Sequence, residues 1–515
     1  MIKLITVSLI FLFILISGNI SAENVRIDYW ENPNEPAIMI NPELPHVLVV
    51  GANMNKYYTS LDTGRNWQKH TLQSNFGVWG DPVIDVDTLG NFYYLHLSRL
   101  PGKVTNMIVC QKSTNHGSNW FDWADIGYNE SKFQDKHWSV IDRKNHNFYI
   151  TWTQFDEYAS KDKDCKSIIR FTSLYTQSWS KPVKINSVDG DCRDSSNTVE
   201  GATPAVGAGG EVYVSWAGPN GLVFNRSTDE GDTWLENEIK IVDIPGGWSF
   251  DIPGIYRCNG FPVTKCDLSG GENHGTIYIN WSDQRNGVND TDIWLVKSTD
   301  RGDTWTSPIR VNNDGKGKHQ FFTWMDIDQT TGYLYFVFYD RRNYNDERTD
   351  VWIAYSEDGG NSFVNKKISE SPFFPHKAVF FGDYSNIVAH QGIVRPVWTR
   401  LDNGQLSIWT DINPLDTTNT SVIEANDSLY ADQYPNPYSA HTYVSFKLHE
   451  MSKVSLRIFD ILGNEISTII NNENRKLGNY IEKIDFVELS VSHGMYFANL
   501  EINGKTKVFK LVYSE

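Results

Sequence analysis

The chain has 515 residues, and its 46 Lys and Arg residues stand against 63 Asp and Glu residues, which gives a formal net charge of −17. This acidity excludes a protein that binds nucleic acid through a basic surface, because the phosphates would be repelled. A hydrophobic fraction of 40% with 21% charged residues excludes a disordered chain. Aromatic residues make up 13% of the chain, and such residues favour β-strands and also line sugar-binding surfaces.

Residues 1–22 are typical of a signal peptide. A short basic start is followed by an apolar run over residues 4–17, and Ile20-Ser21-Ala22 has the small residues of a cleavage site. The alternative, a membrane anchor, is disfavoured because the apolar run is short for a membrane span. No later segment reaches about 18 uninterrupted apolar residues. We therefore expect the mature chain to begin at Glu23 and to contain no transmembrane segment.

Five cysteines follow the signal peptide, and export to an oxidising compartment allows them to form disulfides. Cys165 and Cys192 lie around one irregular insertion and could pair. Cys258 and Cys266 flank a turn-rich stretch and could also pair. Cys110 lies in an apolar run typical of a strand, so we expect it to be a buried free thiol.

One sequence pattern, Ser-x-Asp-x-Gly-x-x-Trp, recurs along the chain. Its copies cover residues 60–67, 113–120, 227–234, 298–305 and 356–363, and a degenerate copy covers 173–179. The Asp carboxylate can accept hydrogen bonds from backbone N–H groups of its own loop, and the Gly can adopt a backbone conformation that other residues resist. The Trp can pack under the hairpin. We interpret this box as a structural turn and not as a catalytic signature.

Short strands with alternating apolar residues precede each copy of the box, for example at residues 275–281 and 292–298. Repeats of about 40–60 residues that carry about four strands indicate a β-propeller. A further set of strands without the box lies at residues 386–409. Counting boxes gives six blades and counting strand pairs gives seven, which we favour. The sequence thus predicts an all-β fold with a six- or seven-bladed β-propeller over residues 23–414.

A different domain is predicted at the end of the chain. Residues 415–429 are rich in Thr, Asn, Asp and Ser and read as a linker. Residues 430–515 contain alternating strands typical of a small β-sandwich, together with Tyr434-Pro-Asn-Pro437, Asp460-x-x-Gly463, Gly494-x-Tyr496 and Lys510-Leu-Val512. This order of motifs resembles the C-terminal sorting domain of type IX secretion cargo in Bacteroidetes. The resemblance implies the type IX secretion machinery as a partner and a secreted or cell-surface protein; the alternative is a carbohydrate-binding sandwich.

The boxes and the strand order over about residues 35–413 resemble the Asp-box (BNR repeat) propellers of the sialidase superfamily. Members with sialidase activity carry an Arg in a Phe/Tyr-Arg-Ile-Pro motif before the first box. Here the nearest string is Val25-Arg26-Ile27-Asp28, without the Pro. The three-arginine clamp for a carboxylate therefore cannot be mapped residue by residue onto this chain.

Candidate site residues are expected on one face of the propeller. In this fold, the connections into the inner strands and the loops after the second strands share a face, and the boxes lie on the opposite face. Carboxyls, a His and Tyr hydroxyls could supply general acid, base or nucleophile. The candidates for catalysis are Asp81, His137, Glu200, Tyr256, Asp283, Asp340, Asp383 and Tyr384. Arginines match carboxylates geometrically, and the candidates for substrate binding are Arg99, Arg257, Arg285, Arg341, Arg342, Arg400 and Trp324. The alternative is that these Asp–Arg pairs only close the ring of blades.

Three functions remain open from the sequence. The first is a secreted glycosidase that acts on acidic extracellular glycans. The second is a polysaccharide lyase on uronate polymers, with His96 or His137 and Tyr256 as base and acid and Arg257 at the carboxylate. The third is a propeller that binds a glycan or a protein without catalysis.

No cofactor is expected. Structural calcium is an alternative reading of two acidic loops, at Asp290 and Asp292 and at residues 346–350, where solvated charges that cap the next strand are favoured. A metal site made of Cys258, Cys266 and His274 is a weak signal, because three ligands at loose spacing are not specific.

Overall fold

The computed structural model describes residues 23–99, 102, 104–175, 178–415, 431–434, 440–448, 451–489 and 491–513. The chain divides into two compact units, Met1–Asp416 and Thr417–Glu515. The expected signal peptide and almost all of the expected linker lie outside the described residues. Every regular element of the described residues is a β-strand, so the all-β prediction is confirmed.

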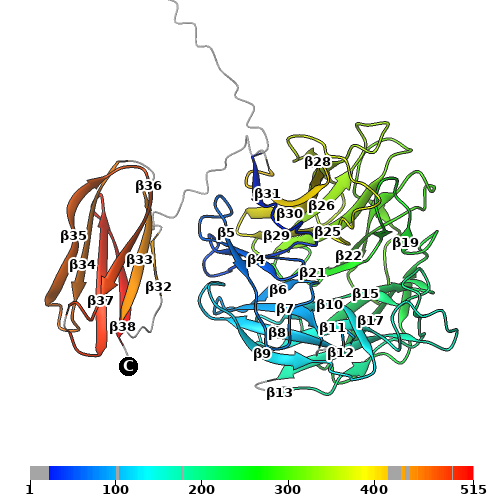
Figure 1. Ribbon diagram of the computed structural model, residues 1–515, viewed down its shortest axis with the longest axis horizontal. Helices are drawn as coiled ribbons and strands as arrows, with labels where there is room; N and C mark the ends of the chain where they lie inside the picture. Colours follow the sequence, from blue (N-terminus) through cyan, green and yellow to red (C-terminus); the bar gives the residue numbers. More distant parts are fainter. Residues whose placement is uncertain are drawn as a thin grey trace, which may run out of the picture. The chain divides into compact units, whose positions relative to one another are not determined.

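Seven sheets follow one another along the described part of the first unit, and each is antiparallel (Figure 1). The first holds β2 (Ala37–Ile40), β3 (Leu48–Ala52), β4 (Lys56–Ser60) and β5 (Gln68–Thr71). The second holds β6 (Val83–Val86), β7 (Phe92–Ser98), β8 (Met107–Ser113) and β9 (Phe121–Ile126). The third holds β10 (Phe133–Ile141), β11 (Phe148–Phe155), β12 (Ser167–Tyr175), β13 (Ser178–Trp179) and β14 (Val183–Lys184).

The next sheets repeat this order. The fourth holds β15 (Glu200–Val206), β16 (Val212–Gly218), β17 (Gly221–Ser227) and β18 (Ile239–Val242), and a pair of short strands, β19 (Ser249–Phe250) and β20 (Cys258–Asn259), follows it. The fifth holds β21 (Val263–Cys266), β22 (Ile277–Asp283), β23 (Asp292–Ser298) and β24 (Ile309–Arg310). The sixth holds β25 (Gln320–Asp328), β26 (Tyr333–Asp340), β27 (Asp350–Ser356) and β28 (Val364–Lys367).

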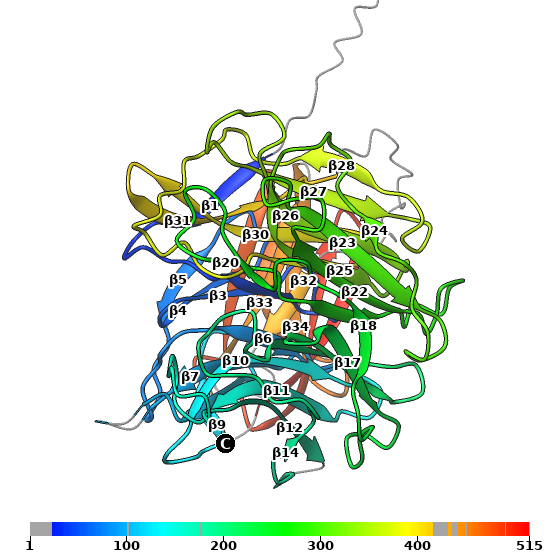
Figure 2. The ribbon, with the colours of Figure 1, turned by 90° about the vertical axis from the view of Figure 1, so that its right-hand side faces the viewer.

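The last sheet joins the two ends of the propeller. It holds β29 (Asn386–His390), β30 (Ile393–Asp402), β31 (Gln405–Asp411) and, at its outer edge, β1 (Asn24–Asp28) from the start of the described chain. The first, inner strands contact one another in the order β2, β6, β10, β15, β21, β25 and β29, and β29 contacts β2. In Figure 2 the colours accordingly run around a ring and return to the blue strand β1. These contacts support the interpretation with seven blades over the one with six.

Most residues of the second strands of the sheets are buried. Every described residue of β7, β11, β16 and β22 is buried. Neighbouring sheets cover both faces of such a strand, so its sequence is nearly continuously apolar or aromatic instead of alternating. Much of the aromatic excess therefore lies in the packing between the sheets.

The box turns are structural, as the copy around Asp229 shows. The hydroxyl of Ser227 donates to the Asp229 carboxylate over 2.6 Å, and the backbone N–H of Thr233 donates to the same oxygen over 2.8 Å. Trp234 donates its ring N–H to the carbonyl of Gly231, and its ring lies 4.8 Å from Phe171 of the preceding sheet. The Trp thus joins two sheets, whereas the sequence had placed it only under its own hairpin.

The cysteines follow the sequence in part. Of the two pairings that the sequence allowed, Cys165 and Cys192 form a disulfide, whereas Cys258 and Cys266 are both free and buried. Cys110 is a buried free thiol, as expected. Cys258 precedes the inner strand β21 and Cys266 ends it, so an extended segment separates the two thiols.

The second unit is a small β-sandwich. One sheet holds β32 (Ala431–Tyr434), β33 (His441–Leu448) and β36 (Gly478–Asp485), and the other holds β34 (Ser452–Phe459), β35 (Glu465–Arg475), β37 (Gly494–Ile502) and β38 (Lys505–Tyr513). Val444, Leu456, Ile484 and Leu500 belong to its own buried core. Among the described residues of the whole chain, no helix has the length and apolar character needed to cross a membrane.

Candidate functional site

Charged side chains gather where the chain enters the inner strands, an end of the propeller that we call the channel mouth. Strand β10 carries a bulge between Asp135 and Trp138, and Lys136 within it has a φ of 45°. Glu35 and Asp81, just before β2 and β6, have φ values of 50° and 52°. Bulges and left-handed residues of this kind redirect side chains at the rim of a barrel or ring. Local backbone geometry thus turns charged side chains from three neighbouring blades toward one place.

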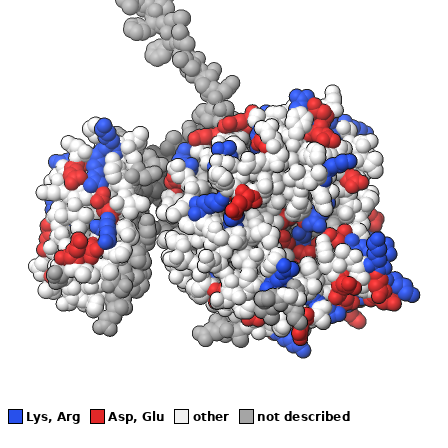
Figure 3. Space-filling model, in the orientation of Figure 1, with Lys and Arg blue, Asp and Glu red and all other residues white. Residues whose placement is uncertain are grey.

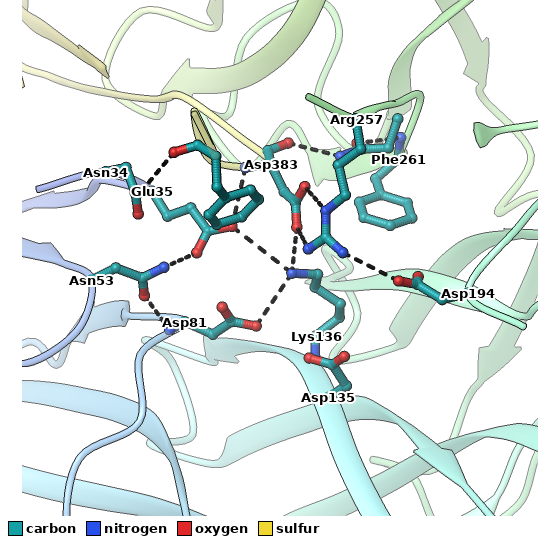
Figure 4. Close-up of polar contacts among 12 residues, drawn as sticks. Asn34, Glu35, Asn53, Asp81, Asp135, Lys136, Asp194, Arg257, Phe261 and Asp383 are labelled. Atoms are coloured by element: carbon teal, nitrogen blue, oxygen red, sulfur yellow. Dashed lines mark hydrogen bonds and ion pairs between the residues drawn. The ribbon is translucent and has the colours of Figure 1, made fainter. Parts of the chain in front are cut away.

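Lys136 is the centre of this group (Figure 4). Its Nζ atom lies 2.7 Å from Oδ2 of Asp383, 3.4 Å from Oδ2 of Asp81 and 4.0 Å from Oε1 of Glu35. The Lys136 side chain is only 6% exposed, and those of Asp383 and Glu35 are 2% and 1% exposed. Buried charges need partners of this kind, because desolvation otherwise penalises the charged form.

Arg257 binds Asp383 from the other side with two parallel hydrogen bonds. Its Nε lies 2.8 Å from Oδ1 and its Nη2 lies 2.5 Å from Oδ2. A third contact runs from Nη1 to Oδ2 of Asp194 over 3.2 Å. The Arg257 side chain is 38% exposed, so this guanidinium faces both the buried carboxylate and the solvent.

Asn53 connects the carboxyl of Glu35 to the backbone of Asp81. Asn53 donates from its side-chain nitrogen to Oε2 of Glu35, and its oxygen accepts the backbone N–H of Asp81 over 2.8 Å. The other Glu35 oxygen accepts the backbone N–H of Asp383 over 3.0 Å. Glu35 therefore ties the first blade to the last one, and Figure 4 shows it beside Lys136.

The carboxyls of this cluster have pKa values that are shifted in opposite directions. Burial acts to raise the pKa of Asp383, but the positive charges of Lys136 and Arg257 outweigh burial and hold that pKa at about 2. Burial raises the pKa of Asp135 to about 7 and raises the pKa of Glu35 well above its usual range. Burial likewise raises the pKa of Glu200, whose two carboxyl oxygens have no hydrogen-bond partner among the described residues. Neighbouring carboxyls therefore differ in their protonation near neutral pH.

Aromatic rings close the channel next to these charges. The rings of Trp138 and Trp324 lie 4.5 Å apart, and that of Tyr384 lies 5.2 Å from Trp138. A cavity of about 10 Å³ lined by these residues and Asp383 has room for about one water molecule. This space is therefore too small to hold a sugar. Burial raises the pKa of Tyr384 well above its usual range, which disfavours this hydroxyl as an anionic nucleophile.

The structure brings together some of the site residues that the sequence predicted. Asp81, Asp383 and Arg257 belong to the cluster. Glu200 lies close enough to Asp135 and Lys136 for their charges to act on its carboxyl. Trp324 and Tyr384 line the cavity below, while Tyr256 is an exposed neighbour of Arg257 in the chain and contacts Phe380. His137 is fully buried, and burial lowers its pKa to about 4.

Other predicted residues form pairs within single blades. Asp283 binds Arg285 and Asp340 binds Arg342, each pair two residues apart at the end of a second strand. Arg400 similarly binds Asp402. The three guanidiniums stack on Trp294, Trp352 and Trp409 of the adjacent third strands. These pairs have a structural role, but each lies within one blade, so they do not close the ring between blades as the alternative expected.

The last two predicted arginines also have protein partners. Arg341 is buried and donates to the carbonyl of Pro253 over 2.7 Å, which anchors the loop that carries Arg257. Arg99 stacks on Trp79 with 3.4 Å between the guanidinium carbon and the ring centre. On the face shown in Figure 3, Lys and Arg residues likewise lie close to Asp and Glu residues instead of forming one basic patch.

Sequence reasoning missed several members of the cluster: Glu35, Asn53, Lys136 and Asp194. A usable signal existed for Glu35, since Glu35-Pro36 precedes the first inner strand just as Asp81-Pro82 precedes the second. No comparable signal marks Lys136, because only the bulge in β10 turns its side chain into the cluster.

The acidic loops do not gather metal ligands. Asp290 accepts the backbone N–H of Gly317, and Asp292 accepts the side-chain nitrogens of Asn286 and Asn312. In the part of the chain that the structure describes, no group of three or more His, Cys, Asp or Glu side chains is placed to hold a metal ion.

The C-terminal unit matches a known family. Residues 432–514 fit the family described as "Secretion system C-terminal sorting domain". The tail is a type IX secretion sorting domain. The protein is therefore exported by that system to the cell surface or the extracellular space. In the sorting domain, Asp460 accepts the backbone N–H groups of Leu462 and Asn464, while residues 435–437 lie outside the described residues.

The chain is also similar to solved all-β structures. The NanB sialidase from Streptococcus pneumoniae is 11% identical, with 64% of this chain and 68% of that chain covered and a TM-score of 0.41. The α-L-arabinofuranosidase Arb93A from Fusarium graminearum is 12% identical, with 76% and 97% covered and a TM-score of 0.43. The α-L-arabinanase from Penicillium chrysogenum is 14% identical, with 64% and 97% covered and a TM-score of 0.38. No curated protein matches the chain. Likenesses at these values do not identify an activity for this chain.

Proposed function

We propose that this protein is a secreted carbohydrate-active propeller that hydrolyses glycosidic bonds of extracellular glycans at the channel mouth. The observation that carries the proposal is the carboxyl of Asp135 beside that of Asp81 at the channel mouth. Burial raises the pKa of Asp135 to about 7, and the negative charge of the nearby Asp81 also acts to raise it. Glycoside hydrolysis uses two carboxyls, one that donates a proton and one that acts as base or nucleophile.

In this proposal Asp135 is the general acid. Below about pH 7 its carboxyl carries the proton that the leaving oxygen of the glycosidic bond needs. Asp81 is the proposed base or nucleophile, since its side chain is 12% exposed and Lys136 lies 3.4 Å away. Asp383 is an anion held by two cations, so its proposed role is to keep Lys136 and Arg257 in place.

Arg257 is the proposed contact for an acidic sugar. Its guanidinium is partly exposed and belongs to the cluster, whereas Arg285, Arg342 and Arg400 are engaged within their blades. A carboxylate on the substrate would meet this one guanidinium. Several carboxyls surround Arg257, and those that are ionised would repel an acidic sugar. The experiment therefore also includes neutral glycans.

The structure does not favour the lyase alternative. A lyase needs an accessible base, and the two histidines considered for that role, His96 and His137, are fully buried. Burial lowers the pKa of each to about 4. Tyr256 is exposed, whereas His137, although near enough to Asp81 for that charge to act on it, is buried. Binding without catalysis remains an outcome of the test.

The test uses the mature full-length protein with sialosides, uronate polysaccharides and neutral polysaccharides. New reducing ends without ultraviolet absorbance of an unsaturated product support hydrolysis, and that absorbance would indicate a lyase. We expect Asp135→Asn and Asp81→Asn to lose hydrolysis at least about 100-fold, with Asp346→Asn as the control because Asp346 is an exposed loop residue paired with Arg348. If the protein binds a glycan but forms no product from any substrate, the result would favour the alternative of binding without catalysis. Loss of acidic-glycan affinity in a folded Arg257→Ala variant would place the acidic sugar at Arg257.

A further inference from the structure

A disulfide joins two loops of the third blade close to the channel mouth. Cys165 lies in the loop between β11 and β12, and Cys192 lies in the connection between β14 and β15. Both cysteines are buried in a small apolar cluster with Phe155, and Phe133 and Tyr158 pack against it. A β-bridge between Ser167 and Gly190 also joins the two segments, two residues after Cys165 and two residues before Cys192. The cross-link adds a covalent tie on the side of Cys192 that leads to Asp194.

The same two segments also meet at Asp194. This residue is two positions after Cys192, and its Oδ2 accepts the hydroxyl of Tyr158 over 2.6 Å. Tyr158 belongs to the segment of Cys165. The φ of Asp194 is 55°, a left-handed conformation that non-glycine residues seldom adopt without support. The hydrogen bond from Tyr158 holds the carboxylate of Asp194 in this position.

Asp194 reaches out of the third blade to Arg257. Oδ2 of Asp194 lies 3.2 Å from Nη1 of Arg257, whose other nitrogens bind Asp383. Arg257 itself lies in the long connection between the fourth and fifth sheets, and Asp383 precedes the seventh inner strand. Three connections from different parts of the ring thus meet in one guanidinium, which Figure 4 shows between the two carboxylates.

We propose that Asp194 is a positioning residue which the Cys165–Cys192 disulfide places, so that Arg257 is held across the channel mouth only in the oxidised protein. Asp383 alone fixes one edge of the guanidinium, and Asp194 fixes the remaining nitrogen. When the disulfide is reduced, a dithiol such as dithiothreitol gives two electrons and two protons to the two sulfurs and becomes a cyclic disulfide. The Ser167–Gly190 bridge remains, but the residues beyond Cys192 lose their covalent tie, so Asp194 can shift away from Arg257. The consequence for catalysis rests on the proposed function, but the position of Arg257 does not.

The test measures the reactivity of Arg257 directly, by mass spectrometry after treatment of the folded full-length protein with phenylglyoxal. We expect reactivity to rise roughly 3-fold to 10-fold in Asp194→Asn and in the Cys165→Ser/Cys192→Ser variant, as for loss of one partly exposed charged hydrogen bond. Reduction of the wild-type protein should have the same effect, because the other three cysteines are already thiols. Asp194→Glu should restore part of the protection.

Two comparisons keep the result specific. Asp189→Asn is the matched control, because Asp189 lies on the same segment but pairs with Lys184. Arg342, paired within its blade, reports global unfolding, so the ratio of Arg257 to Arg342 modification is the quantity of interest. An unchanged ratio in the Asp194→Asn and disulfide variants would overturn the proposal, whether or not the protein hydrolyses any glycan. A raised ratio without hydrolytic activity would retain it and count only against the proposed function.

Discussion

Arg257 and Asp383 form a two-point ion pair across the channel mouth, with 2.8 Å between Nε and Oδ1 and 2.5 Å between Nη2 and Oδ2. Lys136 approaches the same carboxylate to 2.7 Å. One buried anion is thus shared by a cation from strand β10 and a cation from the connection between the fourth and fifth sheets, and this explains why the pKa of Asp383 is about 2 despite its burial. The stability of the propeller and the geometry of its mouth should both depend on this residue.

We expect Asp383→Asn to lower the free energy of unfolding by roughly 3–5 kcal/mol, because removal of one partner leaves Lys136 buried with less compensation. Glycan hydrolysis should fall with it, since Arg257 loses its anchor. Chemical denaturation followed by tryptophan fluorescence measures the stability change. Asp346→Asn removes an exposed ion pair and should change stability by less than about 1 kcal/mol. Equal stability of the Asp383 variant and the wild type would refute a buried ion-pair network.

The raised pKa of Asp135 should make the folded protein less stable as the pH rises. Its pKa of about 7 lies above the usual carboxyl range, so the folded state binds its proton more tightly than the unfolded state does. Stability from this group is therefore present at low pH and is lost as pH rises from about 4 through about 7. The pKa of Asp383 is lowered instead of raised, so the contribution of this group to stability is lost as the pH falls toward 2.

The measurement is the free energy of unfolding between pH 4 and pH 8, for the wild type and for Asp135→Asn. We expect the decline with pH to be smaller in the variant, because the titrating carboxyl is gone, while the buried Glu35 and Glu200 leave part of the decline in place. If Asp135 is the general acid, wild-type kcat/KM should also fall above about pH 7. A decline of the same slope in both proteins would contradict the assignment of the raised pKa to Asp135.

The fold could be predicted from the sequence because its signals are local. Five boxes and the alternating strands around them specify repeated antiparallel sheets, and each box turn is closed by hydrogen bonds within a few residues, as at Ser227, Asp229 and Thr233. The tail was predictable for a similar reason, since its motifs lie in a fixed order. The number of blades was harder, because the seventh sheet has no box and takes its edge strand from residues 24–28.

The site could be predicted only in part, because its geometry depends on contacts between distant segments. Asp81 and Asp383 were found from their place before inner strands, but the residue that joins them, Lys136, enters through a bulge that residue spacing does not reveal. Asp283 and Arg285 illustrate the opposite error. They are two residues apart at a strand end and satisfy each other, so a charged pair on the correct face need not belong to the site.

The box turns should matter for stability and not for activity. Asp229→Ala removes hydrogen bonds from Ser227 and Thr233 and should lower the free energy of unfolding by about 1 kcal/mol. Asp232→Ala, three residues later and exposed, is the matched control and should be nearly neutral. Thermal and chemical denaturation measure both variants. Loss of glycan hydrolysis in Asp229→Ala without destabilisation would show that the box has a functional role.

Removal of the sorting domain should separate export from folding. The two units have separate buried cores, so a chain that ends at Leu415 should keep the propeller folded, with the unfolding temperature of its propeller unchanged. Because the type IX signal lies in residues 432–514, the shortened protein should remain inside the outer membrane of the producing cell while the full-length protein reaches the surface or the medium.

Immunoblots of cell fractions measure the distribution, and Met451→Ser, a change at an exposed position of the tail, is the control for an altered but folded domain. Release of the shortened protein into the medium at the wild-type level would show that export does not require this domain.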